Sequence, residues 1–161
     1  MTSAPMEPAF QDLYADRYSH CYGCGRLNPQ GHQLKSRWNG DDETVARYTP
    51  RPEYSGGVPG HVYGGLIASL LDCHGTASAA AFARRAENPA AADAAGAQPR
   101  GRYVTASLKV DFKRPTPMGT ELVITGRLRA LEGRKVWLDL ALSAGGEVCA
   151  QGEMLALRLQ E

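Results

Sequence analysis

Hydrophobic and polar positions alternate along most of the chain after residue 102, which is the pattern of half-buried β-strands. The alternation predicts a long strand from Tyr103 that ends at Lys113-Arg114-Pro115-Thr116-Pro117, because proline cannot donate to a sheet ladder. Three further strands are predicted, over Glu121–Ala130, Lys135–Ser143 and Glu147–Leu159, with hairpin turns at Glu132-Gly133 and Gly145-Gly146. The apolar stripes are Val104, Ala106, Leu108, Val110 and Phe112 in the first strand, and Val136, Leu138, Leu140 and Leu142 in the third.

The middle of the chain carries a helical period instead and predicts a helix from about Gly64 to Arg85. Its apolar face is long, and its opposite face is made of small residues around one acid, Asp72. Such a face lets another backbone come close, so we expect a sheet on one side and a second subunit on the other. Before the helix the pattern predicts a short helix around Phe10–Tyr18 and two strands, Gln33–Trp38 and Glu43–Thr49. These elements form an α+β fold, an antiparallel sheet curled around a helix.

Length and composition are those of one domain with a core of its own. We expect an N-terminal extension over 1–20, a single domain over 21–161, and a flexible, Ala-rich insertion over 84–101. The formal net charge of +1 gives no sign of nucleic-acid binding. Neither an apolar run of about 18 residues nor a secretory signal is recognised, so we expect no membrane partner and a cytoplasmic location.

The cysteine pair Cys21 and Cys24, in CYGCG, admits three interpretations. A zinc site would want a second Cys/His pair of similar spacing, and a redox motif would begin a helix after a strand. The turn residues around the pair favour a structural turn over both, and we expect no metal in the active site. Cys73 is interpreted as a small buried hydrophobe and His74 as a core histidine.

The stretch GHVYGGLIASLLDCHG, residues 60–75, holds the candidate chemistry. Gly64 and Gly65 present backbone N–H groups at the positive end of the helix, which suits a developing oxyanion. Asp72 supplies a base or a nucleophile. Eight residues of helix separate Gly64 from Asp72 by about 12 Å, too far for one carbonyl carbon to meet both. A two-fold dimer with antiparallel helices resolves this, with Gly64 of one subunit facing Asp72 of the other.

Three segments carry a family resemblance: the Gly-Gly-to-acid stretch over 60–75, the strand VTASLKVDFKRPTPMGTELVI over 104–124, and the opening CYGCGRLNPQGHQL over 21–34. Together they resemble the hotdog-fold acyl-CoA thioesterases, in the branch of phenylacetic-acid-pathway and mammalian hotdog thioesterases. The resemblance implies a hotdog fold with a five- to six-stranded antiparallel sheet around a central helix. It also implies a homodimer with a continuous sheet, often paired into a homotetramer. The implied reaction is metal-free hydrolysis of an acyl-CoA thioester, with no cofactor beyond the coenzyme A of the substrate.

The resemblance also implies roles for individual residues. Asp72 takes the position of the general base or nucleophile, and the N–H groups of Gly64 and Gly65 take that of the carbonyl-polarising donors. Thr105 takes the position of the hydroxyl that helps to hold the attacking water. Thr76 has the spacing of a threonine that assists the acid in another branch of the fold.

The pattern of the family is not fully reproduced. Where the family has a histidine before the glycines, this chain has Tyr63, and His61 lies two residues earlier. Where some members have a side-chain amide in the preceding loop, this chain has Gly57. Tyr63 and His61 are candidate substrate-binding residues, and Lys113 and Arg114 are candidate contacts of the coenzyme A phosphates. The alternatives to a thioesterase are an acyl-CoA-binding protein without catalysis and a hotdog-fold hydratase or dehydratase, although no Asp–His or His–Glu pair of suitable spacing appears.

Overall fold

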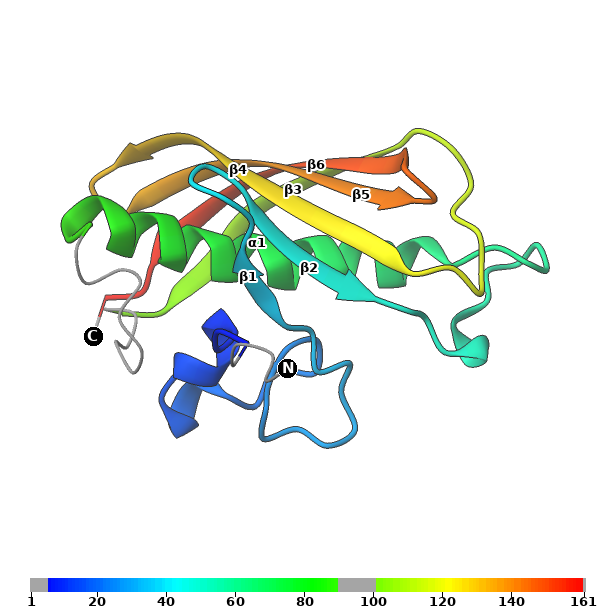
Figure 1. Ribbon diagram of the computed structural model, residues 1–161, viewed down its shortest axis with the longest axis horizontal. Coiled ribbons are helices and arrows are strands. Elements are labelled where there is room, and N and C mark those ends of the chain that lie inside the picture. The colour runs from blue at the N-terminus through cyan, green and yellow to red at the C-terminus, as the bar shows by residue number, and fades with distance from the viewer. Residues whose placement is uncertain (1–5, 90–100, 161) are drawn as a thin grey trace, which may run out of the picture.

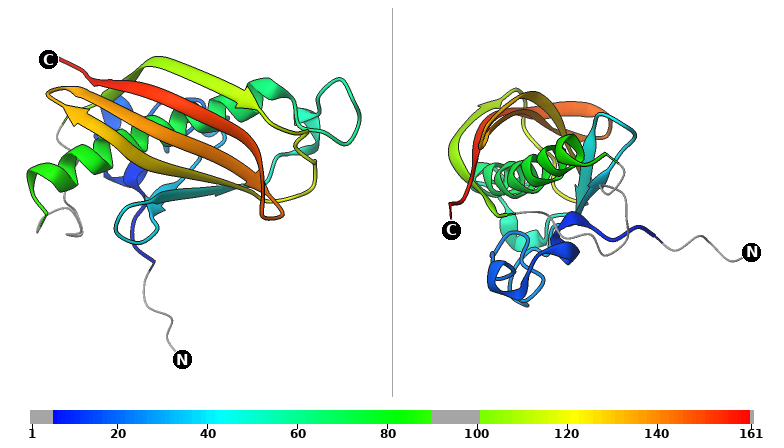
Figure 2. Two further views of the ribbon diagram at one scale, coloured as in Figure 1. Left: turned by 90° about the horizontal axis from the view of Figure 1, so that it is seen from above. Right: turned by 90° about the vertical axis from the view of Figure 1, so that its left-hand side faces the viewer.

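The structure, a computed structural model, describes residues 6–89 and 101–160, and its core is one sheet wrapped around one long helix (Figure 1). All strand pairs are antiparallel, in the order β1-β2-β4-β5-β6-β3. The strands are β1 (Ser36–Trp38), β2 (Thr44–Tyr48), β3 (Tyr103–Phe112), β4 (Leu122–Glu132), β5 (Lys135–Ala144) and β6 (Glu147–Arg158). Figure 2 looks along the helix in its right-hand view and shows the sheet curving around it. The predicted α+β hotdog fold is confirmed.

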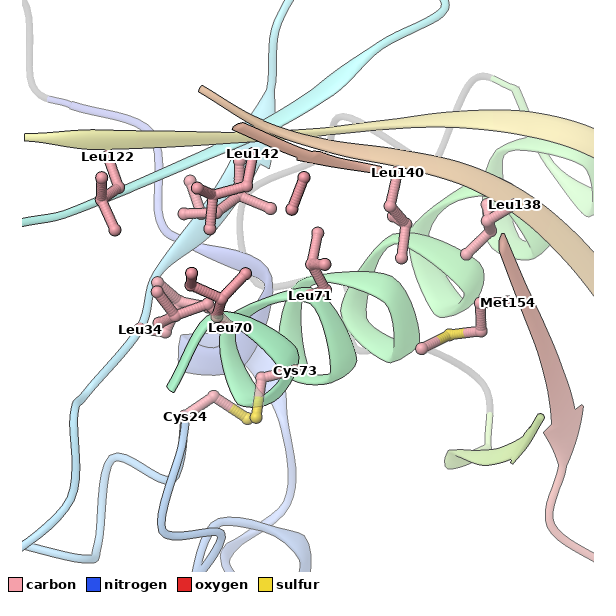
Figure 3. Close-up of a cluster of buried hydrophobic side chains, with 14 of the residues drawn as sticks. Cys24, Leu34, Leu70, Leu71, Cys73, Leu122, Leu138, Leu140, Leu142 and Met154 are labelled. Atoms are coloured by element: carbon pink, nitrogen blue, oxygen red, sulfur yellow. The ribbon is translucent and has the colours of Figure 1, made fainter. Parts of the chain in front are cut away.

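The helix α1 (Gly64–Glu87) lies on the inner face of the sheet and packs its leucines against it (Figure 3). Gly75 permits the close approach, because a Cβ atom there would lie 2.5 Å from the sulfur of Met154 on β6. Among the described residues α1 alone is long and apolar enough to cross a membrane. Because 78% of that apolar stretch is buried inside the fold, its hydrophobicity serves the core. The helix extends to Glu87, so the expected insertion over 84–101 begins in helix, and residues 90–100 lie outside the described residues.

The N-terminal segment packs against this core as two short turns of 3-10 helix rather than one helix over Phe10–Tyr18. These turns are η1 (Phe10–Leu13) and η2 (Asp16–Tyr18), and extended residues separate them. A further turn, η3 (Pro52–Tyr54), precedes the loop to α1. The hairpin between β5 and β6 turns at Gly145 and Gly146, with φ of 58° and 81°, as a two-residue turn with both residues left-handed requires.

One predicted stripe is wrong, because β3 contains a bulge. Its register with β6 shifts between Thr105 and Ser107, so the strand carries one residue more than its partner. An extra residue turns the side chains before it to the opposite face of the sheet. Leu108 packs on the core as predicted, whereas Val104, on the other side of the bulge, is 39% exposed. The stripe of β5 is confirmed, since Val136, Leu138, Leu140 and Leu142 are at most 3% exposed.

Candidate active site

The loop before α1 is fastened to the loop after β3, and this fixes where the helix begins. The Val62 N–H donates to the Thr116 carbonyl at 2.8 Å, and the Met118 N–H donates to the Gly60 carbonyl at 2.9 Å. Gly60 has a φ of +86°, a left-handed conformation that glycine adopts without strain. The chain then enters the helix at Gly64, beside the end of the long strand.

The two glycines occupy the first two positions of α1, and both are exposed. The first four N–H groups of a helix have no intrahelical partner and lie at the positive end of its dipole. A Cβ atom on Gly65 would lie 2.4 Å from the ring of Tyr63, so glycine lets that ring lie beside the helix end. The local structure therefore leaves the predicted oxyanion donors, Gly64 and Gly65, at an open surface.

Two open pockets meet at Gly64 and contain the predicted substrate-binding residues. One, of about 400 Å³, is lined by His61 and Tyr63; the other, of about 370 Å³, is lined by Lys113 and Arg114. The guanidinium of Arg114 pairs with Glu147 at 2.7 Å, and both side chains are more than half exposed. Ion pairs of this exposed kind are worth about 0–1 kcal/mol, so a phosphate could replace the carboxylate at little cost.

Asp72 lies two turns into α1, on the small-residue face, and is partly exposed. The hydroxyl of Thr105 on β3 donates a hydrogen bond to its carboxylate oxygen Oδ1. Because the bulge directly follows Thr105, the strand can aim this hydroxyl at the helix and still pack Leu108 against the core farther along. The structure thus brings together two residues that are 33 positions apart in the chain.

Thr76 uses its hydroxyl differently. Its Oγ1 donates to the backbone carbonyls of Asp72 and Cys73, each at 3.3 Å, and the side chain is 6% exposed. Back-bonding of this kind is ordinary for threonine inside a helix. The hydroxyl is therefore hydrogen-bonded to the backbone beside Asp72 rather than directed at the carboxylate.

His74 is a core histidine, as predicted. It is fully buried, its Nδ1 lies 2.8 Å from the Ser36 hydroxyl, and its Nε2 lies 3.0 Å from the Thr44 hydroxyl. Ser78 donates its hydroxyl to the His74 carbonyl, so Thr44 donates to Ser78 and accepts from the ring, and the imidazole carries its proton on Nε2. Burial lowers the pKa of His74 to about 4, so the ring is neutral near pH 7.

Three features of this region were not found from the sequence. The bulge of β3 has no marker in the residues around it. Thr116 lines both pockets and has a buried hydroxyl without a hydrogen-bond partner among the described residues. Cys73 is buried as predicted, but its sulfur lies 3.7 Å from that of Cys21. Only a three-dimensional structure shows such contacts between distant segments.

Comparison with known proteins places this geometry in a family. The model of the thioesterase superfamily matches residues 59–150, more than half of the chain. Bovine acyl-coenzyme A thioesterase THEM4 is 30% identical over 119 residues, which are 74% of this chain and 41% of that protein. The chain spans about two fifths of the length of the curated relatives it matches.

Solved structures agree with this assignment. A thioesterase superfamily protein from Shewanella loihica is 42% identical, with a TM-score of 0.66, covering 91% of this chain and all of that one. The Escherichia coli PaaI protein of the phenylacetic acid degradation operon shares the fold, with a TM-score of 0.60 and 16% identity, covering 80% of this chain and 81% of that one. On the strength of the family match and the shared fold, this chain belongs to the thioesterase superfamily.

Proposed function

We propose that this protein hydrolyses an acyl-CoA thioester to the free acid and coenzyme A. The observation that carries the proposal is the hydrogen bond from Thr105 to the carboxylate of Asp72, on the helix whose first residue, Gly64, lines both pockets. A carboxylate held in one orientation is suited to take a proton from water or to attack a carbonyl. Membership of the thioesterase superfamily and likeness to an acyl-coenzyme A thioesterase support the same reaction.

The chemistry follows from the charges that develop. Asp72 removes a proton from water as the water oxygen bonds to the thioester carbon, and the carbonyl oxygen becomes an oxyanion beside Gly64 and Gly65. The oxyanion then re-forms the carbonyl, the C–S bond breaks, and the coenzyme A thiolate leaves and takes up a proton. Direct attack by Asp72 would instead form a mixed anhydride that water hydrolyses. In both routes the helix N–H groups stabilise the oxyanion, a contribution commonly worth about 2.7–4 kcal/mol.

The site is shared between two chains in this proposal. Asp72 lies about 12 Å along the helix from Gly64, so one chain alone cannot place both groups against one carbon. The helix face that carries Asp72 is made of small residues, and Gly65, Ala68 and Ser69 on it are exposed or partly exposed. β3 is an edge strand beside this face, and one of its backbone edges is unpaired among the described strands. A two-fold partner could therefore extend the sheet at β3 and bring its own Gly64 to Asp72.

A thiol-release assay tests the reaction. The wild type is expected to release coenzyme A from at least one member of a panel of aromatic and aliphatic acyl-CoAs. Asp72→Asn keeps the size of the side chain and the helix but removes the base, so turnover should fall by 100-fold or more, the scale of general-base catalysis of about 10²–10⁴. Equal, slow release by the wild type and Asp72→Asn on every substrate contradicts the proposal.

One observation favours a second candidate, an acyl-CoA-binding protein without turnover. Gly57 lines the pocket at Gly64, where the family resemblance places a side-chain amide, and among the described residues beyond its two chain neighbours no atom lies within 4 Å of where its Cβ would be. A thioester carbonyl bound there would rely on backbone donors. Tight binding of an acyl-CoA without release of the thiol would establish this function instead.

A further inference from the structure

Three of the four cysteines converge on one point between the N-terminal segment and the helix α1. The sulfur atoms of Cys21, Cys24 and Cys73 all lie within 4.8 Å of one another, and all three residues are free thiols. Cys24 and Cys73 are buried and Cys21 is partly exposed. Figure 3 shows the sulfurs of Cys24 and Cys73 pointing at each other from the two segments.

The spacing of the sulfurs fits coordination better than covalent bonding. Two thiolates on a tetrahedral zinc, each about 2.3 Å from the ion, lie about 3.8 Å apart. The sulfurs of Cys21 and Cys73 are 3.7 Å apart, whereas a disulfide would hold them at about 2.05 Å. The Cys21–Cys73 pair therefore already has the separation that a shared ion requires, and the third sulfur lies within 4.8 Å of both.

The backbone around the cysteines is shaped for this approach. A turn closes over the Cys-x-x-Cys pair, with the Gly25 N–H donating to the Cys21 carbonyl at 2.8 Å. Gly23, inside the turn, could not carry a side chain, because its Cβ would lie 2.2 Å from the sulfur of Cys73. Cys73 is presented by a regular helix that packs against the sheet, so its position is fixed independently of the turn.

We propose that Cys21, Cys24 and Cys73 bind one thiophilic d¹⁰ metal ion, Zn²⁺ or Cu⁺, that ties the N-terminal turn to the helix. Among the described residues the cluster offers three ligands, so a tetrahedral zinc takes solvent as its fourth and Cu⁺ would accept the three thiolates alone. One of its ligands, Cys73, directly follows Asp72 in the sequence, but none of the three cysteines lines the pockets at Gly64. Its role is structural, and it is independent of the thioesterase proposal.

Metal content and binding test the site directly. The protein is purified under reducing conditions, its zinc and copper content is measured per chain, and the metal-free form is titrated anaerobically with Zn²⁺, Cu⁺ and, as a spectroscopic probe, Co²⁺. About one ion per chain and a thiolate-to-Co²⁺ charge-transfer band are expected. Cys21→Ser, which changes the partly exposed ligand, should lower the affinity at least tenfold. Cys149→Ser is the matched control, because Cys149 is a buried free cysteine outside the cluster, and it should bind as the wild type does.

Two results overturn the proposal. One is binding of zinc and copper by the wild type that is no tighter than binding by the Cys21→Ser variant. The other is a disulfide between two of the three cysteines in the freshly isolated protein, detected as an intact mass lower by two hydrogens. This result overturns the proposal if the protein, once reduced, still binds neither zinc nor copper. Because neither result depends on turnover, failure here leaves the thioesterase proposal untouched.

Discussion

The hydrogen bond between Thr105 and Asp72 makes a quantitative prediction about turnover. Thr105→Val keeps the shape of the side chain and removes only the hydroxyl that donates to Asp72 Oδ1. Hydrogen bonds to charged groups contribute about 1.5–3 kcal/mol, and the partial exposure of this pair argues for the lower end of that range. A loss of about 1.5 kcal/mol from the transition state lowers kcat roughly tenfold.

The assay is steady-state thiol release on the best acyl-CoA of the panel, with kcat and KM measured separately. Thr105→Ser keeps the hydroxyl and should retain most of the activity. Ser107→Ala removes an exposed hydroxyl on the other side of the bulge and should leave kcat unchanged. Valine is favoured in strands, so urea unfolding should show Thr105→Val to be as stable as the wild type. A Thr105→Val enzyme with kcat within twofold of the wild type would refute the positioning role.

The remaining predictions concern packing and the carbonyl. Gly75→Ala should destabilise the protein by about 1–2 kcal/mol in urea unfolding, because crowding against Met154 outweighs the gain in helix propensity of up to about 1 kcal/mol. In Gly65→Ala the new methyl group meets only the exposed ring of Tyr63, which can move aside, so the stability should be unchanged or higher. An equal loss of stability in Gly75→Ala and Gly65→Ala would contradict the packing argument. Gly57→Asn adds an amide to the pocket at Gly64 and should raise kcat about tenfold, less than the full effect of a well-placed oxyanion donor on kcat. A lower kcat at unchanged stability would show that this loop does not face the carbonyl.

Periodicity was sufficient to predict the helix and the strands that surround it. The long strand over Tyr103–Phe112 was predicted to the residue, and the helix ends two residues beyond its expected end at Arg85. Both elements are long, so many residues report the period of each one. The short N-terminal elements carry too few residues for this, and there two 3-10 turns replaced the expected helix.

The site was only partly predictable, for a related reason. The glycines and Asp72 share one helix, so their separation follows from helix geometry. Thr105 came from the family resemblance, whereas the strand pattern placed it on the wrong face, because a bulge adds one residue without changing the composition of the strand. The convergence of Cys21 with Cys73 depends on tertiary packing between segments 52 residues apart, which no local pattern encodes.

The shared site is tested most directly by mixing two inactive variants. Asp72→Asn removes the base, and Gly64→Pro removes the N–H group at the first position of the helix, where proline is tolerated. The preceding Tyr63 is extended, with φ of −71° and ψ of 145°, as a following proline demands. Each variant alone should be inactive on thiol release.

Random exchange of equal amounts gives half heterodimers, each with one intact site made of Gly64 from one chain and Asp72 from the other. Activity should therefore recover to about one quarter of the wild type per chain. Exchange is verified with differently tagged chains. A verified heterodimer that stays as inactive as its two parents would contradict a site shared between subunits.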